Sequence, residues 1–418
     1  MPFFNAIYRI KQTEGIAAKS PATKNKVRNM IAKWASVIGL GVFSCLTIAV
    51  QASEIKTSAI QAHITDFESG KVLFSKNADE PMKPASMAKI MTVFVAFQRI
   101  ADGSLKMTDE MTVSKKAWRK GGSRSFVEVG SKVSVHDLLH GIIIQSGNDA
   151  AIVIAEGISG TEEAFADEMN FWAQKIGMTN TNFRNATGWP DPELTTTAAD
   201  MSLLATEMLR RFPADKYPDL YPIFGKRDFT YNKIKQPNRN PLVYGSVGAD
   251  GLKTGHTEES GYGLVGSAIR DNQRVVMVLN GMNSMRERAS ESRRLMDLVF
   301  REFKPYRFFD AGQPVDTANV WLGAMPKVDL VLDAPLKMVL SYKERRDMKL
   351  SVSWQDPIPA PIKAGDQLGT MTVELPGATR TLALRAGHDV APLGLLNRFG
   401  AAIKYLIFGA PVSPAAGQ

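Results

Sequence analysis

Three short motifs that stand far apart in the chain restrict its fold more than any other feature of the sequence. In chain order they are Ser86-Met87-Ala88-Lys89, Ser146-Gly147-Asn148 and Lys253-Thr254-Gly255. Each motif alone has an ordinary explanation, because short patterns of this kind arise by chance in a chain of 418 residues. The presence of all three in this order favours a shared purpose, so we expect the fold to bring the three segments together.

Ser86 and Lys89 have the residue types and the spacing of a nucleophile and its base. Pro84 favours a helix start, and residues three apart share one helical face. The positive field of a helix N-terminus favours developing negative charge on the serine. The residues that follow are apolar on nearly every side, so Lys89 should be buried and pushed towards its neutral form. A serine cap beside a solvated lysine remains the alternative, because Ser53 and Lys56 repeat the pattern.

The second motif falls between two predicted helices, at 135–144 and 148–158. Gly147 permits a tight turn at this joint. Ser146 could relay a proton between the lysine and a leaving group, and Asn148 could hold a substrate amide. The alternative is a helix cap, for which serine and asparagine are both preferred.

The third motif is the most specific of the three. Lys253 offers a fixed positive charge, Thr254 a hydrogen-bond donor for a carboxylate, and Gly255 a place where a ligand backbone can approach closely. The motif directly precedes a predicted pair of strands at 261–270 and 274–281, so we expect it on a strand beside the nucleophile. An exposed loop is the alternative.

Short strand-like runs alternate with helical runs between residues 53 and 302. A hairpin at 59–75 comes first and the strand pair comes last, with helical patterns between them at 86–99, 135–144, 148–158, 161–177 and 198–211. This order predicts an α/β (α+β) domain whose first and last strands share one sheet. After residue 303, short alternating runs separated by Pro, Asp and Gly predict a small antiparallel β domain at 303–391.

The N-terminal segment 1–52 explains most of the net charge of +9, since it holds seven basic residues and one acidic residue. This placement argues against a nucleic-acid partner. The apolar run at 34–50, followed by small residues before Ser53, predicts a signal peptide cleaved after Ala52. A retained membrane anchor is the alternative, and Met30 is a second candidate initiator. Cys45, the only cysteine, lies in the apolar run, so the mature chain has no disulfide, catalytic thiol or cysteine zinc site.

The C-terminal segment 392–409 has apolar residues at helical spacing with basic residues off that face. It is too short and too charged to span a bilayer comfortably, and it suits a helix lying in the membrane interface. Packing on the β domain is the alternative, and 410–418 is a short tail.

The residues around the motifs carry a family resemblance. Asp149 and Ala150 after the second motif, His256 and Thr257 after the third, and Pro-Ala-Ser-Met-x-Lys at 84–89 resemble the serine D-alanyl-D-alanine carboxypeptidases, low-molecular-mass penicillin-binding proteins similar to penicillin-binding protein 5. The resemblance covers about residues 53–409. It implies a serine β-lactamase/transpeptidase-like catalytic domain that removes the terminal D-alanine from peptidoglycan stem pentapeptides, with β-lactams as inhibitors and no metal or organic cofactor. It also implies an exported protein attached peripherally to the periplasmic face of the cytoplasmic membrane through 392–409.

The same resemblance assigns roles to the motif residues. Ser86 would be the nucleophile, Lys89 its base, and Ser146 a proton shuttle. Substrate would be bound by Asn148, Lys253, Thr254, Gly255, His256 and Arg288. The backbone N–H groups of Ser86 and His256 would form the oxyanion hole. Arg286 is a second candidate for the arginine that helps to hold the carboxylate, although Arg288 aligns better.

Three alternatives were weighed against this assignment. A class A β-lactamase would need a glutamate and an asparagine where Asp191 and Thr195 stand, and it would have no use for the β domain. A non-catalytic cell-wall scaffold would not need the serine and the two lysines of the motifs. His136 and His140 imitate a zinc-protease motif, but the motif requires glutamate where Asp137 stands, so we expect ordinary helix residues.

Overall fold

The computed structural model describes residues 55–245, 247–394, 397 and 400. The predicted signal peptide at 1–52, the tail and most of the anchor at 392–409 lie outside these residues. The described chain forms two compact units, one comprising 55–306 with 338–342, and the other 307–337 with the described residues from 343 onward. No helix within the described ranges is long and apolar enough to cross a bilayer.

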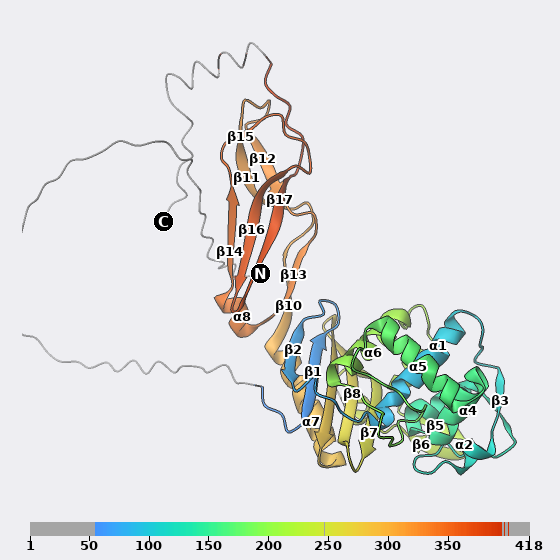
Figure 1. Cartoon of the computed structure of the whole chain (residues 1–418). Helices are drawn as coiled ribbons and strands as arrows, with labels where there is room; N and C mark the ends of the chain where they lie inside the picture. The colour runs from blue at the N-terminus through green and yellow to red at the C-terminus, as the bar shows by residue number, and fades with distance from the viewer. Residues whose placement is uncertain (1–54, 246, 395–396, 398–399, 401–418) are drawn as a thin grey trace, which may run out of the picture. The chain divides into compact units, whose positions relative to one another are not determined.

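The first unit is built on a five-stranded antiparallel sheet. In spatial order its strands are β2 (Val72–Lys76), β1 (Gln61–Asp66), β9 (Gln273–Met282), β8 (Gly261–Arg270) and β7 (Ala249–Thr257). Asp271 and Asn272 link β8 to β9 and both have positive φ, as the tightest hairpin turns require. Because β1 pairs with β9, the first and last strands of the unit lie side by side, which confirms the predicted α/β arrangement (Figure 1).

Helices cover both faces of this sheet (Figure 1). One face carries a mainly helical layer: the 3₁₀ turn η1 (Ala85–Ala88), α1 (Lys89–Ala101), α2 (Lys115–Arg119), α3 (Val135–His140), the π-turn η2 (Gly141–Gln145), α4 (Asn148–Ser159), α5 (Glu162–Ile176) and α6 (Ala198–Arg211). The opposite face is covered by α7 (Met285–Glu302), which buries Leu295, Met296 and Val299 against the sheet. Short elements complete the unit: β3 (Glu110–Thr112), β4 (Lys132–Ser134), η3 (Tyr221–Gly225), β5 (Asp228–Tyr231), β6 (Ile234–Pro237) and η4 (Pro241–Tyr244).

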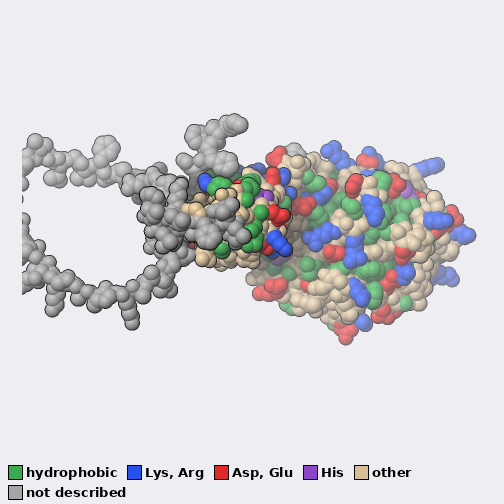
Figure 2. All heavy atoms as spheres, turned by 90° about the horizontal axis from the view of Figure 1, so that it is seen from above, with side chains coloured by type: hydrophobic (Ala, Val, Ile, Leu, Met, Phe, Trp, Pro, Cys, Tyr) green, Lys and Arg blue, Asp and Glu red, His purple; other side chains and the backbone are tan. Residues whose placement is uncertain are grey.

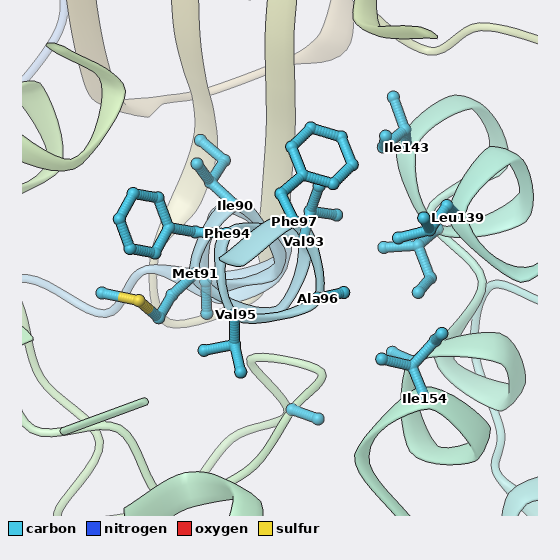
Figure 3. Close-up of a cluster of buried hydrophobic side chains, with 14 of the residues drawn as sticks. Ile90, Met91, Val93, Phe94, Val95, Ala96, Phe97, Leu139, Ile143 and Ile154 are labelled. Carbon is cyan, nitrogen blue, oxygen red and sulfur yellow. The ribbon is translucent and has the colours of Figure 1, made fainter. Parts of the chain in front are cut away.

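Helix α1 forms the centre of the helical layer. Every residue from Lys89 to Phe97 is buried, so the helix is enclosed on all sides, as its apolar sequence predicts. Figure 3 shows its side chains radiating in all directions, with Leu139, Ile143 and Ile154 from neighbouring helices facing one side. Because α1 is enclosed, its first residue, Lys89, is fully buried.

The second unit is a β domain, as predicted. Its six-stranded sheet runs in the order β14 (Lys349–Trp354), β16 (Gln367–Leu375), β17 (Ala378–Ala386), β12 (Lys327–Val331), β11 (Pro314–Trp321) and β15 (Ile358–Pro359). All neighbours are antiparallel except the two-residue β15, which pairs parallel to β11. A separate two-stranded sheet pairs β10 (Phe303–Phe309) with β13 (Leu336–Ser341), and both strands cross the division between the two units in sequence. Helix α8 (Tyr342–Asp347) follows β13.

The surface of the first unit carries both signs of charge. On the face drawn in Figure 2, basic and acidic side chains are interspersed over this unit and do not separate into one-sign areas.

Candidate active site

Ser86 lies in the η1 turn, directly before α1, where two other segments hold it. A Cβ built on Gly188 would lie 1.8 Å from the carbonyl oxygen of Ala85, and one built on Gly255 would lie 2.9 Å from that of Pro84. The turn is therefore clamped between the loop at 187–189 and strand β7. Gly255, which we predicted to admit a ligand backbone, lines the pocket, and its lack of a side chain also allows β7 to pack closely against the serine turn.

Lys89 is fully buried and points at the serine. Its Nζ lies 3.0 Å from Ser86 Oγ, and it donates to Asn148 Oδ1 at 2.7 Å and to the Thr187 carbonyl at 2.5 Å. Burial, and after it the positive charge of Arg239, lower the pKa of Lys89 to about 7. The predicted desolvated lysine beside the serine is therefore present in the structure, and it is poised to accept a proton near neutral pH.

The second motif forms a corner between η2 and α4. Ser146 ends η2 in the left-handed conformation with φ of 66°, and Asn148 begins α4. Asn148 uses both ends of its amide within the protein, because Oδ1 accepts from Lys89 and Nδ2 donates to the Gly121 carbonyl at 2.8 Å. Asn148, which we predicted to hold a substrate amide, lines the pocket, and its Oδ1 also holds Lys89 in place.

Asp149, the next residue, organises a loop that the sequence did not assign to the site. Its buried carboxylate accepts the backbone N–H groups of Ser125 at 2.7 Å and Phe126 at 3.0 Å. The loop that it fixes contains Gly121, the partner of Asn148. A buried acid next to a motif was the available signal, but the loop it binds is distant in sequence.

A pocket of about 1190 Å³ opens over the serine. The predicted residues that line it are Ser86, Ser146, Asn148, Thr254, Gly255, His256 and Arg288. Lys89 and Lys253 stand behind this lining. Lys253 is buried and donates to its own neighbour's carbonyl, Thr254 O, at 3.1 Å. Burial and the nearby charge of Lys89 lower the pKa of Lys253 well below its ordinary value.

Arg288 reaches the pocket from α7, whereas Arg286 is absent from the lining. Arg288 is only 5% exposed, and its guanidinium lies 5.6 Å from the centre of the Tyr262 ring. One long hydrogen bond of 3.4 Å joins its Nη1 to the Gly255 carbonyl, and among the described residues its buried Nε has no partner. Burial lowers its pKa to about 10. A guanidinium held this way is ready to receive a carboxylate.

Arg239 also lines the pocket, although no pattern in the sequence marks it as a site residue. It donates to Ser123 Oγ at 2.5 Å, and burial lowers its pKa. Its charge acts on Lys89, Lys253 and Arg288, so it stands near all three. No motif marks a single arginine in a loop, and only the fold brings it to the serine.

The residues that resemble a β-lactamase loop and a zinc-protease motif lie outside the pocket lining. Asp191 is outside the pocket lining, and its carboxylate accepts the Glu193 N–H at 2.8 Å and lies 3.8 Å from Arg184. His140 is buried, its Nε2 is 2.9 Å from Lys226 Nζ, and burial lowers its pKa to about 4. Within the described ranges no group of three or more His, Cys, Asp or Glu side chains could hold a metal ion.

Comparison with known proteins identifies the family. Residues 48–284 match the D-alanyl-D-alanine carboxypeptidase family of S11 peptidases, and 303–383 match the C-terminal domain of penicillin-binding protein 5. The chain is 38% identical to D-alanyl-D-alanine carboxypeptidase DacC of Escherichia coli (strain K12) over 75% of this chain and 79% of that protein. The chain belongs to the D-alanyl-D-alanine carboxypeptidase family.

Solved structures agree with this membership. Penicillin-binding protein 5 from Haemophilus influenzae is similar with a TM-score of 0.66 and 32% identity, over 82% of this chain and all of that one. Penicillin-binding protein D2 from Listeria monocytogenes, in its ampicillin-bound form, is similar with a TM-score of 0.53 and 28% identity, over 59% of this chain and 99% of that one. The protein is accordingly a serine hydrolase with D-alanyl-D-alanine carboxypeptidase activity, as the motifs predicted.

Proposed function

We propose that this carboxypeptidase removes the terminal D-alanine of peptidoglycan stem pentapeptides through an acyl-enzyme on Ser86. The observation that carries this proposal is the 3.0 Å contact between Ser86 Oγ and a lysine whose pKa is about 7. Neutral Lys89 takes the hydroxyl proton while Oγ attacks the carbonyl carbon between the two D-alanines. The proton passes to the leaving amine, the C–N bond breaks and free D-alanine departs. Water then hydrolyses the ester and restores the serine.

The other residues of the site bind the substrate and stabilise the charge that develops during the reaction. Arg288 and Thr254 receive the terminal carboxylate, Arg239 adds a positive charge from the same lining, and the buried Lys253 lies next to Thr254 in the chain. The backbone N–H groups of Ser86 and His256 face the developing oxyanion, and Ser146 hands the proton towards the leaving group. Asn148 keeps Lys89 aimed at the serine.

β-Lactams should acylate the same serine, because they mimic the D-alanyl-D-alanine end. Benzylpenicillin treatment followed by mass spectrometry should add one penicilloyl mass to the Ser86 peptide, and Ser86→Ala should abolish both this adduct and D-alanine release. Unchanged D-alanine release by Ser86→Ala would refute the mechanism and favour a non-catalytic scaffold for this pocket. Fast release of hydrolysed penicillin would favour a β-lactamase, which the position of Asp191 away from the pocket argues against.

We also propose that the protein is exported and held at the periplasmic face of the cytoplasmic membrane by residues 392–409. The support is the sequence pattern of the two ends and the amphipathic spacing at 392–409. Removal of residues 392–418 should release active enzyme into the soluble fraction. Sedimentation of the shortened, active protein with membranes would contradict the anchor.

A further inference from the structure

Trp189 forms a wall of the pocket that the proposed reaction does not use. It is 41% exposed and lines the pocket. The backbone of Trp189 is held in place, because Asn185 Oδ1 and Thr187 Oγ1 accept its N–H at 3.0 and 3.1 Å. Its ring lies on Gly122, where an added Cβ would come within 3.0 Å of it. The indole is thus an oriented plane and not a loose surface side chain.

The ammonium of Lys120 lies beside the Trp189 indole. Lys120 Nζ lies 4.6 Å from the centre of the Trp189 ring. No carboxylate pairs with Lys120 among the described residues, so its charge is held by the ring and by solvent. The pocket lining itself carries three arginines and a single acid, Glu258. Trp189 therefore offers the pocket an apolar face, and Lys120, which lies beside the ring and outside the lining, adds a positive charge next to it.

The direction of the substrate follows from the clamp around the serine turn. On one flank, Arg288 of α7 donates to the Gly255 carbonyl of β7 and receives the terminal carboxylate. The other flank is Gly188, next to Trp189. A peptide with its carboxylate at Arg288 and its reacting carbonyl at Ser86 can continue along the lining that Gly188 and Trp189 form on the other side of the turn. The residue before the two D-alanines is then the one that meets Trp189 and Lys120.

We infer that Trp189 and Lys120 form a specificity subsite for stem peptides whose residue before the two D-alanines has a carboxylate on its side chain. The aliphatic stem of that side chain lies along the indole, and its carboxylate approaches the Lys120 ammonium. A side chain that ends in an ammonium alone, such as lysine, meets like charge there. This inference rests on the proposed stem-peptide function and names the substrate class within it.

The test compares three pentapeptides that differ only at this residue: diaminopimelate, lysine and Nε-acetyl-lysine. Wild-type enzyme should show a higher kcat/KM for the diaminopimelate peptide than for the lysine peptide by about fivefold, the size of one partly solvated charge interaction. Lys120→Met should bring the two within about twofold, and Lys120→Glu should favour lysine. Lys115→Met, an exposed lysine at the other end of α2 without the contact that Lys120 makes to the Trp189 ring, should preserve the wild-type ratio.

Trp189→Leu should lower kcat/KM for all three peptides, because each lays an aliphatic stem on the ring. Benzylpenicillin acylation of Ser86 should persist in every Lys120 variant, since penicillin has no equivalent of this residue. Equal kcat/KM for the diaminopimelate and lysine peptides in wild type, or an unchanged ratio in Lys120→Met, would overturn the subsite. Loss of acylation and D-alanine release in wild type would instead overturn the proposed function.

Discussion

The two sides of the pocket differ in how their polar groups are satisfied. On the helix side, comprising the η1 turn, α1 and the 146–148 corner, the groups bond one another: Lys89 has three oxygen partners and the Asn148 amide is fully used. On the strand side, comprising β7, α7 and the segment 237–244, the cations are short of partners. Arg288 has one long hydrogen bond, and no carboxylate among the described residues pairs with Arg239, Lys253 or Arg288.

This difference separates chemistry from recognition. A base must keep one geometry through the reaction, so its surroundings are complete before substrate arrives. A binding site for an anion keeps its donors unpaired, because an internal carboxylate would compete with that of the substrate. Burying several like charges together destabilises the free protein, and a bound carboxylate relieves that cost. Changes on the helix side should therefore alter kcat, and changes on the strand side should mainly alter substrate affinity.

The largest effect is expected from Lys89→Met. Removing the base should lower kcat for D-alanine release by about 10²- to 10⁴-fold, the usual range for a general base, while substrate affinity changes little. Steady-state kinetics with a D-alanyl-D-alanine peptide would measure both constants. Lys56→Met is the matched control, because Lys56 stands in the other Ser-x-x-Lys pattern and is exposed. If Lys89→Met raised only KM and left kcat unchanged, the assignment of chemistry to the helix side and binding to the strand side would be wrong.

Arg288→Ala should come next, through affinity. A charged hydrogen bond to the terminal carboxylate is worth about 1.5–3 kcal/mol, so kcat/KM should fall by roughly 10- to 100-fold, mostly through KM. Arg286→Ala, two residues earlier and outside the pocket lining, should behave as wild type. Equal losses in the two variants would show that net charge, and not a positioned guanidinium, receives the carboxylate.

The smallest expected effect is the pH dependence of kcat/KM, in which Arg239 on the strand side influences the Lys89 base on the helix side. The pKa of Lys89 is about 7, below its ordinary value, so the neutral base predominates above that pH and is lost below it. Between pH 7 and pH 6, kcat/KM should fall by about fivefold as Lys89 takes up a proton. Arg239 lowers this pKa by charge, so Arg239→Gln should move the acidic limb to higher pH. A limb that stays in place in this variant would show that Arg239 does not influence the base.

Sequence reasoning reached the elements with strong local patterns. The hairpin at the start, the helix at 198–211 and the strand pair at the end were predicted nearly to the residue, because amphipathic spacing and turn residues are local signals. It predicted one helix over 86–99 with the serine and the desolvated lysine on one face; in the structure Ser86 lies in the η1 turn and the α-helix begins only at Lys89. It could not find Arg239 or the loop that Asp149 holds, since these depend on segments that meet only after folding.

By itself, the sequence determined which chemistry is available: a serine beside a lysine in an apolar segment, a corner with a glycine, and a strand that carries Lys253. It also determined the family, through the order of three motifs. Only the tertiary structure decided what each polar group does. In the folded protein, Asn148 accepts a hydrogen bond from Lys89, and Lys253 is left out of the pocket lining. Arg288 lines the pocket and Arg286 does not. Trp189 lies exposed beside Lys120. The physical reason is that burial and charge act through distances in space, and chain order does not specify those distances.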